Sequence, residues 1–464
     1  MKPTLTLLTS CLLLAACNTS APSIDSGIQP PPSWEFAQGA ALQRTDAQWW
    51  QQFGSPDLNR LIEQARVNSH EVAAAMARVR QAQATATIAG APTRPELTYD
   101  IRGERNKFLR SSDRKASPSD DNNTDAFTTS LTASYEVDFW GGVAAARDSA
   151  LHRLKASEFD RATVELTLLS SVADRYAQTL SAREQSHIAE LNLANARNVL
   201  RLVQTRYDSG SATALELAQQ KNLVATQQRE LPRIQQLANE QQITLAALLG
   251  QPVQHLQLGN QDFENLSWPP IGTGLPSELL TRRPDIAKAE AELVAAQADV
   301  TVARAALLPK LTLSATLGTE VVRAEDWLRA PFSSLAAGLT GPIFNNGRLS
   351  AERDKATARQ EELLEIYRGA IINSFADVEK ALNSISGLDQ QRHWHDEELK
   401  QAQTAFRIAQ SRYEAGAEDL LTVLETQRTL YLAQDVSVQL RLSRVQASIA
   451  LYKALGGGWT QTLH

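Results

Sequence analysis

The sequence predicts a mainly α-helical fold with a membrane β-barrel portion, built from two copies of one structural plan. Three observations predict it: two very long helical segments, four strands in which apolar and polar residues alternate, and a set of motifs that occurs twice in the same order. Because sequence repeats of this kind come from repeated structural units, the two halves of the chain are expected to fold alike.

The chain begins with a segment typical of export. Lys2 precedes an apolar run of about ten residues, which is too short for a membrane helix, since such a helix needs roughly 20. The run ends in Leu14-Ala15-Ala16-Cys17, which resembles the cleavage site of bacterial lipoproteins, and Asn18 then favours sorting to the outer membrane. Cys17 is therefore the expected acylation site. The alternative is an ordinary secretory signal followed by an unrelated cysteine.

Composition argues against several classes of protein. Cys11 leaves with the signal, so Cys17 is the only cysteine of the mature chain and no disulfide is expected within it. Removal of Lys2 takes the formal net charge from −6 to −7 without leaving any basic block, so nucleic acid is not an expected partner. His393 and His395 point to different sides of a helix, so no metal site is expected. No convincing catalytic arrangement is present, and neither an enzyme nor a cofactor is expected.

Pairs of similar segments show the duplication. They are Arg206–Asn222 with Arg412–Arg428, His70–Tyr99 with Arg282–Leu313, and Glu136–Asp148 with Gly341–Asp354. Each half is expected to contain a helix, two strands, a very long helix, a turn and a shorter helix. The expected divisions are a signal peptide at 1–16, an acylated extended segment at 17–56, the first repeat at 57–250, a linker at 251–275, the second repeat at 276–455 and a tail at 456–464.

The four strands are expected at about 95–107, 126–139, 309–321 and 332–344. In the second, the odd positions from Phe127 to Phe139 are apolar apart from Thr129, and the even positions are polar. This alternation predicts a sheet with one apolar and one wet face. The polar face carries the acids Asp100, Glu136, Asp138 and Glu320.

The alternative for these strands is a half-buried sheet in a soluble domain. Against it, the strands run to about 10–13 residues, whereas ordinary strands average five or six and tilted membrane strands about 9–11. Four strands cannot close a barrel, and an open edge is not tolerated in lipid. Several chains must therefore share one barrel if the strands lie in a membrane.

The helical segments are unusually long. Val143–Tyr207 contains neither proline nor glycine, and Arg348–Tyr413 contains only Gly369 and Gly387. At 1.5 Å per residue, each helix would be roughly 95–100 Å long. The shorter helices, about 57–89 and 213–249, are expected to stack end to end beside a long one. A soluble coiled-coil rod is the alternative, but it leaves the alternating strands unexplained.

Several motifs follow the Cys17 signal in order. They are Trp49–Phe53 with Pro56-Asp57-Leu58, Arg282–Ile286, Pro309–Leu311, Gly341–Phe344 with Gly347-Arg348, and the paired Arg-Tyr-x-x-Gly turns. Along essentially its whole mature length the chain thereby resembles the outer-membrane efflux factors, the TolC-like channel-tunnels, and in particular their NodT-type lipoprotein branch.

The resemblance implies a homotrimer in which three chains give four strands each to a twelve-stranded barrel, continued by a long α-helical barrel across the periplasm. It implies a lipid-anchored outer-membrane subunit that conducts small molecules for an inner-membrane pump, of the RND type, through a periplasmic adaptor. The alternatives are a lipid-anchored periplasmic scaffold or adaptor, and the exit duct of a type I secretion system. The exported substrate is not identified by the sequence.

The resemblance also implies functional residues at the turns between long and short helices. The adaptor-contact turns would be Ser209, Gly210 and Ser211 in the first repeat and Ala415, Gly416 and Ala417 in the second. Glycine is expected there because such a turn needs a positive φ.

The gate of the family would be formed by residues near these turns. Glu216 and Tyr413 match a hydrogen-bonded pair, and Glu425 and Arg428, which share one helix face, match a constriction ring between protomers. The alternatives are a packed turn residue for Tyr413 and a solvated ion pair for Glu425 with Arg428. Some relatives have arginine at the position of Glu418 and aspartate at that of Thr422, so fewer acids are expected at this gate.

Overall fold

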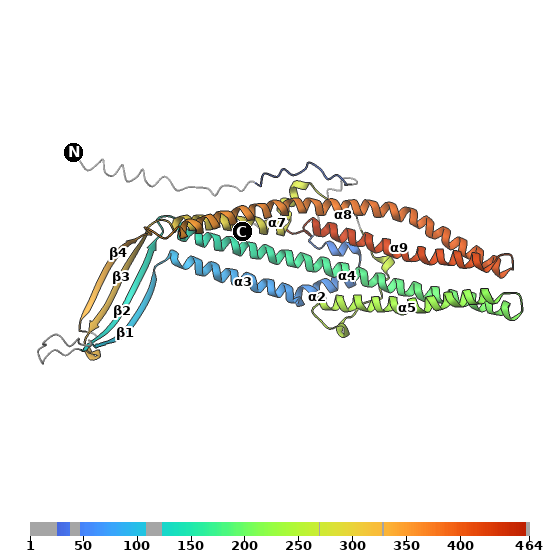
Figure 1. Ribbon diagram of the computed structural model, residues 1–464, viewed down its shortest axis with the longest axis horizontal. Coiled ribbons are helices and arrows are strands. Elements are labelled where there is room, and N and C mark those ends of the chain that lie inside the picture. Colours follow the sequence, from blue (N-terminus) through green and yellow to red (C-terminus); the bar gives the residue numbers. More distant parts are fainter. Residues whose placement is uncertain (1–25, 38–46, 108–122, 269, 327–328, 461–464) are drawn as a thin grey trace.

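The computed structural model describes residues 26–37, 47–107, 123–268, 270–326 and 329–460 of the chain. The molecule is elongated, with a four-stranded sheet at one end and two helical hairpin turns at the other (Figure 1). Cys17 and the signal peptide lie outside the described residues.

The sheet consists of β1 (Glu96–Lys107), β2 (Asn123–Val137), β3 (Lys310–Val321) and β4 (Pro331–Thr340). The strands follow one another in the order β1-β2-β3-β4, and every neighbouring pair is antiparallel. The two repeats meet in the middle of the sheet, where Leu131 of β2 lies between Tyr99 of β1 and Leu317 of β3. The four predicted strands are confirmed, and β1 and β4 form the two edges.

Two strands end earlier than the alternation suggested. β2 ends at Val137, because the Asp138 carboxylate turns to the start of the next helix and accepts hydrogen bonds from the amides of Val143 (3.0 Å) and Ala144 (2.7 Å). Asp138 is therefore a helix cap, and its predicted place on the polar face of the sheet is wrong. β4 ends at Thr340, and an added Cβ at Gly341 would lie 3.2 Å from Pro309, where the chain bends out of the sheet.

The two long helices are α4 (Gly142–Asp208) and α8 (Arg348–Glu414), each of 67 residues and thus about 100 Å long. This confirms the predicted lengths. Shorter helices lie end to end along them (Figure 1). They are α2 (Pro56–Asn68), α3 (His70–Gly90) and α5 (Ala214–Leu248) beside α4, and α6 (Leu279–Arg282), α7 (Pro284–Ala305) and α9 (Leu420–Ala454) along α8.

The helix expected at about 57–89 is divided at Ser69. This residue has an extended conformation (ψ 120°), and its hydroxyl accepts a hydrogen bond from the Val72 amide at 3.3 Å. Its own amide meanwhile donates to the Ala65 carbonyl at 2.9 Å. Ser69 thus ends α2 and begins α3, since a serine side chain offers the backbone an alternative to the helical ladder.

The main core lies at mid-length, where α2, α4, α5 and α9 meet the short helix η1 (Trp49–Phe53). Trp49 is fully buried and stacks on Tyr452 with ring centroids 5.1 Å apart. The Tyr452 hydroxyl donates to the Gln52 side chain at 2.6 Å. The sequence motif at 49–53 is therefore the aromatic anchor of this core.

The N-terminal strap, residues 26–37, is fixed to the second repeat. Trp34 is buried against Phe375 and donates its indole N–H to the Gly274 carbonyl at 3.0 Å. The Glu379 carboxylate accepts the amides of Glu35 (2.8 Å) and Phe36 (3.2 Å). The strap is thus held against α8 and the Gly274 carbonyl.

Among the helices of the described residues, none combines the length and the apolar character that crossing a lipid bilayer requires.

Candidate functional site

The two hairpin turns at the end distant from the sheet have the same backbone geometry. Gly210 has a φ of +79° and Gly416 a φ of +76°. In the first turn the Ser211 amide donates to the Arg206 carbonyl, and in the second the Ala417 amide donates to the Arg412 carbonyl, both at 2.8 Å. These are the bonds of a helix end closed by a left-handed residue. The predicted need for glycine is confirmed.

Beyond each turn, a different side chain begins the next helix. In the first repeat the Glu216 carboxylate accepts hydrogen bonds from the Thr213 amide (2.6 Å) and the Thr213 hydroxyl (2.9 Å), forming a capping box at the start of α5. In the second repeat Asp419 accepts from the Thr422 amide at 2.8 Å. Hydrogen bonds from Thr422 lower the pKa of the Asp419 carboxyl. In both turns, hydrogen bonds therefore fix the end of one helix and the start of the next.

Tyr413 lies buried between the two hairpins, with 2% of its surface exposed, in a cluster that includes Val203, Leu217 and Phe406. Its hydroxyl has no hydrogen-bond partner among the described residues. Burial raises the pKa of this phenol, Arg206 counteracts the rise, and the charge of Glu216 adds to it. The expected hydrogen bond between Glu216 and Tyr413 is absent here because Glu216 is engaged with Thr213, so that pair stays a prediction.

Glu425 and Arg428 lie on one exposed face of α9, as their spacing suggested. Within the described chain they form no ion pair with each other or with another residue. Arg428 borders a groove of about 680 Å³ between α4, α5 and α9, beside Leu424 and Asp435. Among the described residues these two charges therefore have no ion-pair partner, and the ring between protomers stays a prediction.

Arg206 is the residue at this end that sequence reasoning overlooked. Its guanidinium donates to the Tyr413 carbonyl at 2.5 Å and lies 4.3 Å from the centroid of the Tyr413 ring. The equivalent Arg412 instead pairs with Glu418 at 3.2 Å, within its own hairpin. The repeated Arg-Tyr pair was visible in the sequence, but it did not show that Arg206 contacts the other hairpin while Arg412 stays within its own.

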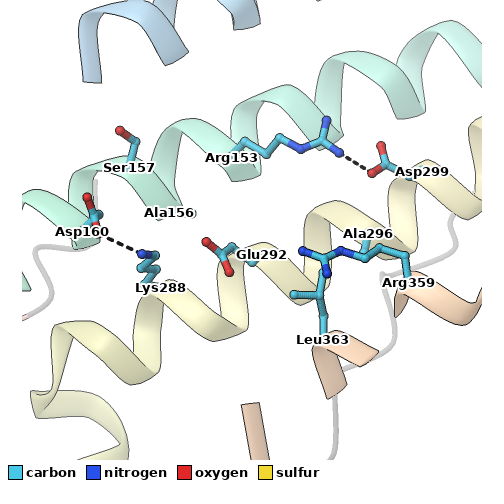
Figure 2. Close-up of a pocket in the computed structure, with 10 residues that line it drawn as sticks. All are labelled: Arg153, Ala156, Ser157, Asp160, Lys288, Glu292, Ala296, Asp299, Arg359 and Leu363. Carbon is cyan, nitrogen blue, oxygen red and sulfur yellow. Dashed lines mark hydrogen bonds and ion pairs between the residues drawn. The ribbon is translucent and has the colours of Figure 1, made fainter. Parts of the chain in front are cut away.

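A second hollow, of about 360 Å³, lies between α4, α7 and α8 near the sheet end (Figure 2). Four of the charged side chains that line it pair across the helices: Arg153 with Asp299, and Lys288 with Asp160 at 2.8 Å. Figure 2 shows both pairs bridging α4 and α7. They join neighbouring helices and include no nucleophile with an adjacent base.

The histidine cluster also has a structural role. His395 is buried, with Nδ1 3.0 Å from the Glu398 carboxylate and Nε2 2.9 Å from the Ala433 carbonyl, so it ties α8 to α9. In the described part of the chain, His, Cys, Asp and Glu side chains form no group of three or more that could hold a metal ion.

The sequence profile of the family described as "Outer membrane efflux protein" matches residues 61–251 and 275–457. The chain is 59% identical over 458 residues to the "Pyoverdine export outer membrane protein OpmQ" of Pseudomonas aeruginosa, covering 98% of this chain and 97% of that protein. It is 54% identical to the protein of the same name in Pseudomonas putida, with the same coverage. The "Cation efflux system protein CusC" of Escherichia coli is 29% identical and covers 98% of the chain.

Solved structures agree with these matches. The outer-membrane channel OprN superimposes with a TM-score of 0.88 at 25% identity, covering 95% of this chain and 99% of that one. CusC, described as a transmembrane channel, superimposes with a TM-score of 0.82 at 27% identity, over 93% of this chain and 99% of that one.

Proposed function

Because this chain belongs to the outer membrane efflux protein family, we propose that it is the trimeric exit duct through which a pyoverdine-type siderophore leaves the cell. It is an outer-membrane channel of an efflux system, extends into the periplasm and is not an enzyme. The trimer, the substrate and the gate go beyond this and are argued separately.

The proposed substrate rests on one observation: the chain is 59% identical, over 98% of its length, to a protein named for pyoverdine export. Relatives named for cations or for solvents are only 28–29% identical. A Cu(I) path is not favoured, because Met1 and Met76 are the only methionines and soft thioether ligands are what Cu(I) prefers.

Expression in a P. aeruginosa strain lacking OpmQ tests the substrate. We expect the chain to restore pyoverdine in the medium and to lower the amount held in the periplasm. A chain that reaches the outer membrane at normal levels but leaves pyoverdine in the periplasm contradicts the proposed substrate. The matched control is CusC expressed at the same level, for which no restoration is expected.

The proposed trimer is supported by the sheet. Among the residues that the structure describes, β1 and β4 each have one edge without a neighbouring strand, and the side chains of Leu97, Leu335 and Leu339 are largely exposed. A sheet with open edges and an apolar face is stable in lipid only if the edges pair, and three such sheets would form a closed barrel of twelve strands. A lipid-anchored scaffold would leave these edges and this apolar face without a role.

The proposed partners follow from the turns at the other end. Ser209–Ser211 and Ala415–Ala417 are exposed, and backbone hydrogen bonds define both turns, which suits docking of a periplasmic adaptor that couples the channel to an inner-membrane pump of the RND type. Acylation at Cys17 would anchor the chain to the outer-membrane lipid. A type I secretion duct would instead restore export of a protein and leave pyoverdine unchanged.

The proposed gate lies beside these turns. Among the described residues, the exposed side chains of Glu425 and Arg428 have no ion-pair partner, so each is available to a neighbouring protomer. The Tyr413 hydroxyl is buried without a partner, so it would gain one only if the packing of the hairpins changed. We expect Glu425→Ala and Tyr413→Phe trimers in planar bilayers to conduct more than the unaltered trimer. Equal conductance in the absence of adaptor would remove these residues from the gate.

A further inference from the structure

We infer that Arg206 is a latch that holds the two helical hairpins together at the tip, next to the second adaptor-contact turn. The inference rests on the proposed function in one respect: it assumes that the hairpins separate when the channel opens. It assigns a role to a residue that the sequence resemblance left without one.

A seam of polar contacts joins the hairpins along α4. From the core toward the tip, Asp174 accepts from Gln446 (2.7 Å), Gln185 donates to Asp435 (3.3 Å), and the Asn192 carbonyl accepts from Tyr431 (2.8 Å). Arg206 continues this seam past the start of α9, at the end of α8.

The contact of Arg206 differs chemically from the others. Its guanidinium donates to the carbonyls of Tyr413 (2.5 Å) and Glu414 (3.4 Å), which are among the last carbonyls of α8. Such carbonyls have no partner within the helix and carry the negative end of its dipole. The same guanidinium lies over the Tyr413 ring. The Tyr413 carbonyl also accepts from the Gly416 amide at 2.9 Å, so Arg206 adds a second donor there and one at Glu414. One cation thus binds the end of a helix and stacks on a buried aromatic ring, without any carboxylate.

A comparison of the two repeats explains why Arg206 contacts the other hairpin while Arg412 does not. In the second repeat Arg412 forms a salt bridge with Glu418 of its own hairpin, and it also donates to the Ala417 carbonyl at 3.3 Å. The equivalent position in the first repeat is Ala212, which offers no acid. Arg206 is therefore free to reach the other hairpin.

The latch is close to the surface where the adaptor is proposed to dock. A Cβ placed on Gly416 would lie 3.8 Å from the Arg206 guanidinium. A partner seated over Gly416 would therefore touch the latch and could replace its contacts. Since a ligand shifts an equilibrium only through contacts that differ between the two states, this position gives the adaptor a direct route to the gate.

The test is single-channel recording of purified trimers in planar bilayers without adaptor, comparing Arg206→Gln with the matched control Arg412→Gln. We expect Arg206→Gln to raise the open probability at least tenfold and Arg412→Gln to leave it within twofold, because only the first breaks a contact between hairpins. Arg206→Lys keeps the charge and one donor but loses the planar stacking, so an intermediate value is expected. All three variants should still assemble as trimers, so that the open probabilities compare intact channels.

A second measurement separates the latch from a general loosening of the tip. Combining Arg206→Gln with Tyr413→Leu should add less to the open probability than the two single changes together, since both remove the same stacking contact. An unchanged open probability in Arg206→Gln, or equal effects of the two glutamine variants, would overturn the latch while leaving the channel intact. Absence of any pore in the unaltered protein would instead overturn the proposed function, and the latch with it.

Discussion

Replacing Trp34 by alanine is expected to release the N-terminal strap from α8. The indole is 7% exposed, and a buried tryptophan removes about 150–250 Å² from water, which at about 25 cal/mol per Å² contributes up to about 4–6 kcal/mol. Its hydrogen bond to Gly274 adds about 1 kcal/mol, and ordering the strap offsets part of the sum. A net loss of about 4 kcal/mol is expected, in the range measured for Trp→Ala changes.

Hydrogen exchange of the strap measures this loss directly. The amides of Glu35 and Phe36 donate to Glu379, so their exchange reports whether the strap is docked. A loss of about 4 kcal/mol corresponds to a roughly thousand-fold fall in protection, since each 1.4 kcal/mol is a factor of ten. Phe36→Ala is the matched control, because that ring is 46% exposed and should lower protection little. Unchanged protection in Trp34→Ala would refute the argument.

Three further predictions concern the helical hairpins. Gly416→Ala should destabilise the tip by about 1–2 kcal/mol, because it places a Cβ at a φ of +76°. Gly369→Ala, within α8, should instead stabilise that helix by about 0.5–1 kcal/mol. Thermal unfolding of both variants checks this, and a stabilising Gly416→Ala would contradict it. Burial raises the pKa of Tyr431 to about 12, so the stability that its protonated hydroxyl provides should be complete below about pH 10 and lost as the pH rises toward 12. Stability measured against pH should therefore fall less over that range in Tyr431→Phe, and identical profiles would show that the phenol is not responsible. Asp138→Ala should cost about 1 kcal/mol by removing the carboxylate that accepts the first amides of α4, and a thermal stability equal to that of the unaltered protein would show that these two hydrogen bonds do not stabilise the helix.

Patterns that depend on local spacing predicted the fold well. Three sequence patterns reflect local requirements of the backbone. They are the alternation around Leu131 in a strand, the absence of proline from Val143 to Tyr207 in a helix, and the repeated glycines of the turns. The presence of four strands and the lengths of the long helices were therefore predictable from the sequence. The duplication strengthened these predictions, because each helix or strand predicted in one half had a counterpart predicted in the other.

The ends of elements were predicted less well, since they depend on single side chains that can satisfy the backbone in two ways. Asp138 continues the polar alternation of its strand, yet its carboxylate is used to cap α4. Ser69 sits within a helical pattern, yet its hydroxyl starts a new helix. In both cases a tertiary or local hydrogen bond outweighs a periodicity that the sequence shows clearly.

The sequence predicted where the two turns lie but not the contacts of the residues around them. The turns and Tyr413 lie together at the tip, as expected, while Glu216 bonds to Thr213 instead of Tyr413. The crossing of Arg206 depends on Ala212 lacking the acid that Glu418 provides to Arg412. Such a contact joins residues about two hundred positions apart, so it could not be read from either hairpin alone.

The mass and conductance of the purified particle test the central claim most directly. Material extracted from outer membranes is expected to contain three chains per particle by light scattering and to form ion-conducting pores in planar bilayers. A particle of one chain that inserts no pore would contradict the account, because four strands with open edges would then have to be stable on their own.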